Sequence, residues 1–462
     1  MLIASWVISF IVVIGIGILS GNKVKSANEW SGADKTMGLI EVGCLLGAWQ
    51  IGGMSVVGAA QNGYSFGIAA MWYSLGSALY FLPLGAMAKI VRRNMPGDSA
   101  AVYMRSRYNK YVSRFYSFIW LVMAWCYVPV QLKTVASIIG IVLPDISSLT
   151  GMFLGLCIAA LYTGFAGMKG ASIVSKIACF GTYICVVLLV FLGLNSFGGY
   201  SGLLEQLPAD YSKIFNGSMD IPYVISLVLG GFLSSSVMQT VLQPVMAAKD
   251  GRSAGFGCIL GYIIGAPICI FTGIIGMMAA AKSNMTLGDG STAFAWYVKE
   301  SCSPLFAGIL FAIVTVIIAA TMASMMMAAG TVLKEFYGDL INPRATDKQL
   351  LNLSRWGTII FSYSCLLPAM IIPSASLTTL FLTLVYGATC PFSFAIIFGL
   401  LWKKVNTSSA LWSSIAGVVT SVFWVLSGLN DTVCSVVYPT IIVSYAVGIV
   451  ISLSSKQKNT LT

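Results

Sequence analysis

Thirteen apolar runs, each close to the length of a membrane-spanning helix, dominate the sequence. A helix needs about 20 residues to cross about 30 Å of hydrocarbon. Runs of this kind lie near residues 2–20, 39–61, 67–88, 115–140, 149–166, 173–194, 221–246, 255–280, 304–333, 356–374, 377–401, 408–427 and 435–454. No connection between them is long enough for a soluble domain. The sequence therefore predicts one all-α polytopic membrane domain over residues 1–462.

Charged side chains are too scarce to cover a soluble protein. They make up 9% of the residues, whereas roughly a quarter of a soluble domain is charged. With the N-terminus outside, 22 Lys and Arg fall on the cytoplasmic side of the alternating runs, and only Lys213, Lys282 and Lys299 fall outside. This asymmetry follows the positive-inside rule. We therefore expect a multi-pass plasma-membrane protein with its N-terminus outside and its C-terminus inside. We therefore attribute the net charge of +11 to membrane topology and to contact with anionic lipid, and not to nucleic-acid binding.

Absent and unpaired residue types limit the chemistry further. The chain has no His, which excludes imidazole-based metal sites, catalytic triads and proton relays. Its 11 Cys lie in or beside the apolar runs without CxxC pairing, so we interpret them as small packing residues. The first run has no basic residue before Trp6 and is followed by its first lysines. This order predicts a retained helix rather than a cleaved signal peptide.

Two of the runs contain glycine clusters that predict interrupted helices. The run at 39–61 has four glycines around residues 48–51, and the run at 221–246, five runs later, has a Gly-Gly pair followed by three serines and a glutamine. Glycine-broken spans at corresponding positions of two five-helix halves are typical of inverted-repeat transporters. The alternative interpretation is that these glycines serve only close helix packing.

With these features the chain resembles the sodium:solute symporter family, whose members share the LeuT-type, five-plus-five inverted-repeat fold. The resemblance covers nearly the whole chain and rests on six segments in order, at residues 31–38, 47–58, 161–167, 246–250, 319–324 and 399–406. It implies about 13 transmembrane helices. The first repeat would cover residues 39–194, the second residues 221–401, and the peripheral helices residues 2–20, 408–427 and 435–454.

The resemblance also implies a sodium site between the runs at 39–61 and 304–333. The first run would supply the backbone carbonyls of Ala48 and Ile51. The second would supply the carbonyl of Ala320 and the side chains at the paired Ser/Thr positions, which are Ala323 and Ser324 here. Oxygen ligands suit a hard cation. Ser324 keeps the hydroxyl and Ala323 has none, so Na⁺ is the expected coupling ion at a site with one ligand fewer. No other cofactor is expected.

A second departure from the family pattern concerns the run at 173–194. The family usually has an Asp there, and the corresponding position is Ser175, followed by Lys176. An ammonium can supply the charge of a bound cation. One hypothesis is therefore that Lys176 lies in or near the ion site and makes transport sodium-independent or proton-linked. The alternative is that Lys176 reaches the membrane interface from the end of its helix.

Polar and aromatic residues in and near the interrupted runs are candidate solute contacts. Amides and hydroxyls suit hydrogen bonds to a small polar solute, and aromatic rings suit walls or gates. Serines in such helices also commonly bond their own backbone, which is the alternative role. Lys133 either faces an aqueous cavity and pairs with an anionic solute or reaches the outer interface. The candidates are Trp49, Gln50, Gln131, Lys133, Ser234, Ser235, Ser236 and Gln239.

These observations predict a secondary active transporter, and not an enzyme. We expect it to carry a small polar organic solute across the plasma membrane by alternating access, coupled to Na⁺. Its expected partners are the solute and membrane lipid, and the identity of the solute and the oligomeric state stay open. An uncoupled channel or facilitator is the main alternative. A membrane sensor is disfavoured because only eight residues follow the last run.

Overall fold

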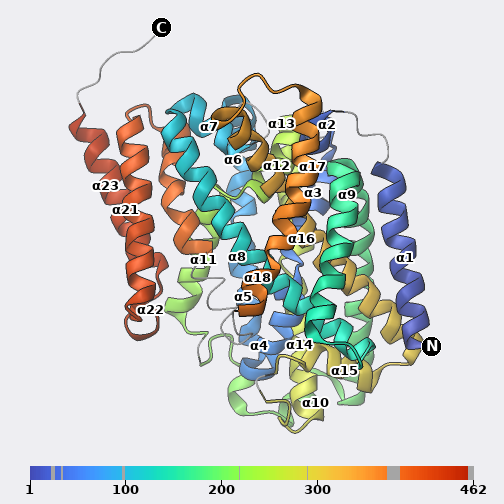
Figure 1. Cartoon of the computed structure of the whole chain (residues 1–462). Helices are drawn as coiled ribbons and strands as arrows, with labels where there is room; N and C mark the ends of the chain where they lie inside the picture. The colour runs from blue at the N-terminus through green and yellow to red at the C-terminus, as the bar shows by residue number, and fades with distance from the viewer. Residues whose placement is uncertain are drawn as a thin grey trace.

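The chain forms a bundle of helices (Figure 1). The computed structural model describes residues 1–21, 26–32, 35–95, 99–217, 219–288, 290–371 and 385–455, and their only β pairing is two isolated bridges. The helices up to residue 205 are α1 (Leu2–Gly21), α2 (Ala27–Gly32), α3 (Leu39–Gln50), the π-helix η2 (Met54–Gly58), α4 (Ala59–Phe66), the 3₁₀ helix η3 (Gly67–Met71), α5 (Trp72–Ala78), α6 (Phe81–Asn94), α7 (Ala100–Arg107), α8 (Lys110–Val142), α9 (Ser148–Ser196) and α10 (Gly199–Glu205).

The second part of the chain begins with the 3₁₀ helix η4 (Ala209–Ser212). It continues with α11 (Ile221–Ser235), α12 (Gln239–Ala247), α13 (Gly251–Gly265), α14 (Ile268–Lys282), α15 (Ala293–Ser301), α16 (Pro304–Leu340), α17 (Asp347–Ser364), α18 (Leu366–Ile371), the π-helix η5 (Phe394–Phe398), α20 (Gly399–Leu401), α21 (Thr407–Leu426), α22 (Leu429–Thr432) and α23 (Val437–Ser454).

The lengths and composition of these helices confirm the all-α polytopic prediction. Within the described chain, seven helical segments are long and apolar enough to cross a membrane, and the bent pair α11–α12 raises the number to eight. Four shorter apolar helices accompany them. The count of thirteen is not confirmed, because the two runs predicted between residues 356 and 401 enter residues 372–384, which lie outside the described chain. The repeat boundaries at 39–194 and 221–401 stay predictions.

Both glycine-rich runs are interrupted, as predicted. α3 ends at Gln50, and the helix resumes at Met54 as a π-helical turn that continues into α4. α11 ends at Ser235 and α12 begins at Gln239, with the two helices bent by 51°. A helix end leaves backbone groups without their partners four residues away. At the first break a side chain takes the place of a missing N–H donor, because the hydroxyl of Ser55 donates to the carbonyl of Gln50 at 2.6 Å.

The long helix α9 doubles back on itself. Gly155, near its start, lies against Val135 in the last third of α8, and Gly193, near its end, lies against the C-terminal half of α14. Between them, Lys169 pairs with Glu29 of α2 at 3.2 Å, at the opposite end of the bundle (Figure 1). A straight helix of 49 residues would be about 73 Å long. The two arms of α9 therefore match the runs predicted at 149–166 and 173–194. The side chains of residues 161–167 lie outside what the structure describes.

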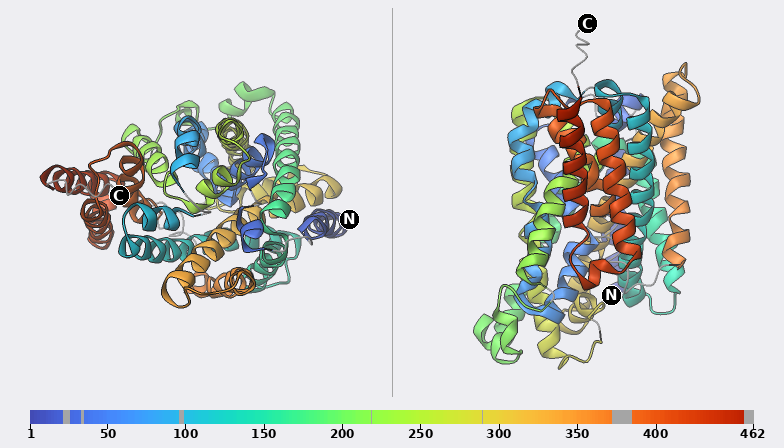
Figure 2. Two further views of the ribbon diagram at one scale, coloured as in Figure 1. Left: turned by 90° about the horizontal axis from the view of Figure 1, so that it is seen from above. Right: turned by 90° about the vertical axis from the view of Figure 1, so that its left-hand side faces the viewer.

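The two ends of the bundle differ in the number of basic residues in the last turns of their helices. Met1 lies at the end that also holds α10 and α15, which we call the N-terminal face, and α23 finishes at the opposite end, the C-terminal face (Figures 1 and 2). At the C-terminal face, α6 ends with two arginines and α7 with two more. At the N-terminal face, α14 and α15 each have one lysine in their last turn. The start of the chain and the end of α23 thus lie on opposite faces.

Glycines allow α4 and α14 to approach closely. An added Cβ at Gly276 of α14 would lie 1.9 Å from the carbonyl oxygen of Ala60, and one at Gly63 of α4 would lie 2.1 Å from that of Gly273. Both neighbours are backbone atoms, so a side chain at either position has to push the helices apart. Small residues are what permits such backbone contact between membrane helices.

We expect the Gly276→Ala substitution to destabilise the protein by about 1–3 kcal/mol, as overpacking of a tight contact does. Gly140 of α8 provides the matched control, because an added Cβ there has no atom within 4 Å. Gly140→Ala should leave stability unchanged or raise it by up to about 1 kcal/mol, since alanine is the better helix former. Thermal unfolding of the purified variants in detergent measures both. Equal melting temperatures for Gly276→Ala and wild type would show that the two helices are not held at this separation.

Candidate functional site

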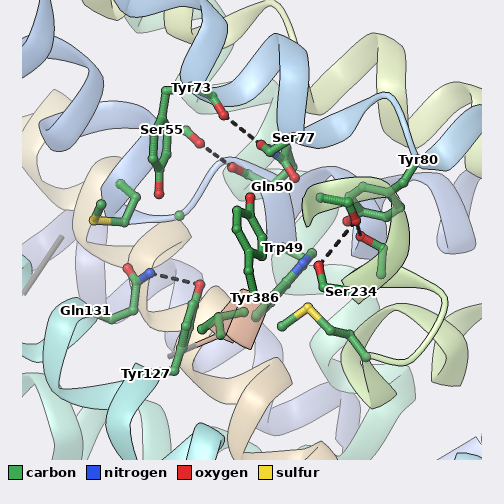
Figure 3. Close-up of a pocket in the computed structure, with 16 residues that line it drawn as sticks. Trp49, Gln50, Ser55, Tyr73, Ser77, Tyr80, Tyr127, Gln131, Ser234 and Tyr386 are labelled. Carbon is green, nitrogen blue, oxygen red and sulfur yellow. Dashed lines mark hydrogen bonds between the residues drawn. The ribbon is translucent and has the colours of Figure 1, made fainter. Parts of the chain in front are cut away.

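A cavity lies in the centre of the bundle, between the two interrupted spans (Figure 3). It holds about 530 Å³ of empty space, including open solvent. None of the described residues that line it is Asp, Glu, Lys or Arg. They are Trp49, Gln50, Gly52, Met54, Ser55, Tyr73, Ser77, Tyr80, Tyr127, Gln131, Gly231, Ser234, Ser235, Met238, Val385 and Tyr386.

Gln50 joins the end of α3 to α5. Its side-chain amide donates to the hydroxyls of Ser74 at 2.9 Å and Ser77 at 3.0 Å. Its backbone carbonyl accepts the hydroxyl of Ser55. One residue at the break therefore binds three serines, of which Ser55 and Ser77 line the cavity (Figure 3). The prediction that Gln50 belongs to the solute site is consistent with this position.

Gln131 of α8 holds the other side of the same break. Its Oε1 accepts the backbone N–H of Gly53 at 2.9 Å, and its Nε2 donates to the hydroxyl of Tyr127 at 2.9 Å. Gln131 is fully buried. The ring of Tyr127 stacks on Trp49, with centroids 5.1 Å apart. The amide thus satisfies the first backbone donor after the break and places an aromatic pair in the cavity wall (Figure 3).

Ser234 and Ser235 bring the second interrupted span to the cavity. Both hydroxyls donate to the carbonyl of Gly231 in their own helix, that of Ser234 at 3.2 Å. This is the backbone role considered as the alternative for these serines. Their oxygens keep lone pairs that can accept from a solute, because a hydroxyl has one proton and two lone pairs. Tyr80 and Tyr386 complete this wall (Figure 3).

Three predicted solute contacts do not line this cavity. Lys133 lies two positions after Gln131, and two residues turn a helix by about 200°, so it faces away. Ser236 lines a separate apolar hollow and donates to the carbonyl of Leu233 at 2.7 Å. Gln239 is fully buried and accepts the backbone N–H of Ala100 at the start of α7 at 2.9 Å. These three residues therefore lie outside the cavity that the other predicted solute contacts line.

The predicted ion ligands lie beside the first break. The hydroxyl of Thr321 in α16 donates to the carbonyl of Ala48 at 2.9 Å, which places α16 directly against the end of α3. One turn away from Thr321, Ser324 donates to the carbonyl of Ala320 at 2.9 Å. Ala48 and Ile51 are fully buried, and the three α16 positions of the predicted site are at most 8% exposed. The two chain segments named for the site are thus in contact, and Thr321 adds a hydroxyl that the sequence comparison did not include.

Lys176 contacts Glu41 near the start of α3. Its Nζ lies 3.1 Å from Oε1 of Glu41, and the other carboxylate oxygen of Glu41 accepts the N–H of Gly38. Ala48 lies seven residues further along α3, or about 10 Å. In this structure the ammonium is therefore paired near the C-terminal face and does not stand among the ion ligands. Ser175 beside it is buried.

Several residues of the site were absent from the sequence prediction. Tyr127 lies four positions before Gln131, so the two share a helix face, and this spacing was a usable signal. Tyr80 and Tyr386 also line the cavity. They lie outside the two interrupted spans, so only the tertiary arrangement of the helices reveals that they face it. Groups of three or more His, Cys, Asp or Glu that could hold a metal do not occur among the described residues. All 11 cysteines are free thiols, as their interpretation as packing residues requires.

Similar proteins include transporters from bacteria. The osmoregulated proline transporter OpuE of Bacillus subtilis is 22% identical and covers 99% of this chain and 95% of its own length. The sodium/glucose cotransporter of Vibrio parahaemolyticus is 22% identical over 89% of this chain and 82% of its own. Among solved structures, the substrate-bound outward-open state of a Na⁺-coupled sialic acid symporter matches with a TM-score of 0.82, at 15% identity, over 100% of this chain and 99% of that one.

The structural match shows that the fold is that of the sialic acid symporter, and it agrees with the interrupted spans described above. The family model for the sodium:solute symporter family matches residues 31–417, which is most of the chain. Its members are transporters, in agreement with the prediction that the protein is not an enzyme. The chain therefore belongs to the sodium:solute symporter family.

Proposed function

We propose that the protein is a Na⁺-coupled symporter that moves a small polar solute without net charge by alternating access. The single observation that carries this proposal is the cavity between the two interrupted helices, directly beside the contact between Ala48 and Thr321. Solute and coupling ion then share the first break, so that each stabilises the arrangement the other needs. Binding at the repeat interface near the midplane is the general mode of such transporters.

The absence of net charge on the solute follows from the cavity wall. Among its described lining residues there is no ionised side chain, and burying a charge without a partner costs several kcal/mol. The backbone N–H of Gly53 at the start of the resumed helix is the natural donor for a carboxylate. Gln131 already occupies it. Amides, hydroxyls and aromatic rings remain, and they suit a neutral polar solute or a zwitterion, whose carboxylate is accompanied by its own ammonium.

The solutes of the relatives provide a test panel. Their names give proline, glucose, pantothenate and sialic acid. Thermal unfolding of the purified protein with each compound, in NaCl and in choline chloride, measures binding because a ligand of the folded state raises its stability. We expect stabilisation, in NaCl, by proline or glucose or by compounds of their charge class. Stabilisation by the anions pantothenate and sialic acid alone would contradict the proposal.

The ion ligands that we propose are the carbonyls of Ala48, Ile51 and Ala320 and the hydroxyl of Ser324. The Ser324 hydroxyl gives its proton to the carbonyl of Ala320, which leaves its lone pairs for a cation. The break in α3 supports the carbonyl ligands, since these groups lack continuous helix beyond Gln50. Thr321, bonded to the carbonyl of Ala48, is well placed to hold this arrangement.

Ala323→Ser should strengthen Na⁺ binding. The substitution returns a hydroxyl to the family position that has lost it, and one contact to a charged group contributes about 1.5–3 kcal/mol. We expect roughly a tenfold lower Na⁺ half-saturation, since about 1.4 kcal/mol corresponds to a factor of ten. Stabilisation by increasing NaCl at constant ionic strength measures it, and Ala319→Ser, one turn earlier in α16, is the control. An unchanged or higher half-saturation would count against this location of the ion.

Sodium-independent transport through Lys176 is the weaker candidate. Its ammonium contacts Glu41, which argues against a role as a stand-in for the ion. An uncoupled facilitator is distinguished by proteoliposome uptake, because it cannot concentrate its solute. For orientation we propose that the C-terminal face, with the arginines of α6 and α7, is cytoplasmic and that the protein lies in the plasma membrane.

A further inference from the structure

A second hollow, the apolar groove, lies between α6, α11, α12 and η5–α20. It holds about 390 Å³ of empty space, including open solvent. Four residues of α6 form its floor, from Pro83 to Val91, and Tyr80 separates it from the central cavity. Phe232 of α11 is 38% exposed at its edge, so the groove opens to the side of the bundle. The central cavity and the ion site make no use of this space.

The apolar groove ends at a basic hollow on the C-terminal face, which we call the basic mouth. Leu400 lines both hollows. The other residues of the basic mouth are Arg93, Asn94, Tyr103, Ser106, Arg107 and Gly399, around about 900 Å³ of space that includes open solvent. The α6 and α7 helices that supply most of them lie side by side at this end in Figure 1. An apolar channel thus leads to a cluster of cationic and polar donors.

The donors of the basic mouth are available for an anion. Arg93 is exposed at the end of α6 and makes no hydrogen bond or ion pair within the described part of the chain. Arg107 is held in place by the carbonyls of Gly399 at 3.3 Å and Val405 at 3.4 Å, which leaves other N–H groups of its guanidinium for a ligand. Tyr103 adds a phenolic hydroxyl, which is protonated at neutral pH and can donate a hydrogen bond.

The dimensions fit one leaflet of a bilayer. From Pro83 to Arg93 the helix rises by about 15 Å, and half of the hydrocarbon core is also about 15 Å thick. An acyl chain that lies along α6 from the basic mouth would therefore reach the level of Pro83, less than one turn from Tyr80. The upper part of the path is cationic and the lower part apolar, which is the order of polarity in a phospholipid with a negative headgroup.

We propose that the apolar groove and the basic mouth bind one anionic phospholipid of the leaflet at the C-terminal face. The phosphodiester would lie between Arg93 and Arg107, and one acyl chain would follow α6 toward Tyr80. Because Tyr80 also lines the central cavity, the lipid would contact a wall of the solute site from behind. The site goes beyond the proposed transport function and does not depend on it.

The test is lipid retention by the purified protein, measured by native mass spectrometry. Phosphatidylglycerol and phosphatidylcholine with identical acyl chains are the probes. We expect preferential retention of phosphatidylglycerol, and a loss of about fivefold in its affinity in Arg93→Gln, since one basic residue near a membrane surface contributes about 1 kcal/mol. Arg344→Gln is the matched control, because Arg344 is also exposed and lies in the connection between α16 and α17 at the same face.

Two further arms separate the chain from the headgroup. Met87→Trp fills the apolar groove and should lower retention while leaving the basic mouth intact. Inorganic phosphate at 10 mM, roughly a physiological level, should not displace the lipid, whereas displacement would identify a free-phosphate site and overturn the proposal. Equal retention of the two lipids, or an equal loss in Arg93→Gln and Arg344→Gln, would also overturn it. Wild-type melting temperatures in the Arg93 variant show that its fold is kept.

Discussion

Gln131→Leu is expected to lower solute uptake into proteoliposomes by roughly 10- to 100-fold. The substitution keeps the volume but removes the acceptor of the Gly53 N–H and the donor to Tyr127. A buried donor left without a partner costs about 1–3 kcal/mol. That cost falls on the break in the first interrupted span, at the position where solute and ion are proposed to meet. The stacked pair of Trp49 and Tyr127 loses its anchor at the same time.

The control for this experiment is Lys133→Gln, on the opposite side of the same helix. Lys133 does not line the cavity, so we expect nearly wild-type uptake of the same solute in that variant. Full uptake by Gln131→Leu would show that the break does not need this amide. Loss of uptake in Lys133→Gln with retention in Gln131→Leu would restore the earlier hypothesis that Lys133 faces the solute.

Ser324→Ala is expected to remove the stimulation of uptake by sodium. Ala323 already lacks a hydroxyl, so this change deletes the last one at the paired positions of the predicted site. One lost contact to a charged group corresponds to about 1.5–3 kcal/mol, or roughly a 10- to 100-fold higher Na⁺ half-saturation. At ordinary NaCl concentrations uptake in sodium should then approach uptake in choline.

Ser362→Ala is the matched control for Ser324→Ala, at a position outside the predicted ion site. Ser362 is also buried in a helix, and its hydroxyl also donates to the carbonyl four residues earlier. It should therefore leave sodium stimulation intact. The double variant Ala323→Ser/Ser324→Ala moves the hydroxyl by one position and should recover part of the stimulation. An unchanged sodium requirement in Ser324→Ala would place the coupling ion elsewhere.

The sequence predicts the helical architecture and the two breaks because both depend on local properties. Run length against bilayer thickness sets the spans, and a glycine cluster weakens helix propagation at Gly52–Gly53. The interruption after Gln50 confirms this interpretation. Gly230 and Gly231 lie inside α11, where an added Cβ at Gly231 would lie 2.8 Å from the backbone of Ser77, so this pair serves close helix packing. Helix periodicity also separates the residues of α8 that face the cavity from those that do not. Lys133 and Gln131 cannot share a helix face, whereas Tyr127 and Gln131 do.

Long-range contacts explain what the sequence did not predict. Gln239 bonds Ala100, 139 residues away, and so caps a helix instead of facing the solute. Lys176 meets Glu41 across 135 residues. The sequence around Gln239 or Lys176 does not reveal these partners, because each partner belongs to a helix far away in the sequence. The role of Thr321 beside Ala48 is hidden in the same way.

Equilibrium binding of ²²Na⁺ to the purified protein tests the central claim most directly, because it needs no knowledge of the solute. We predict saturable binding that unlabelled Na⁺ displaces and choline does not. Binding should be weakened roughly tenfold or more in Ser324→Ala and unchanged in Ser362→Ala. Binding that choline displaces equally well, or identical saturable binding in Ser324→Ala and wild type, would contradict an ion site at the contact between α3 and α16.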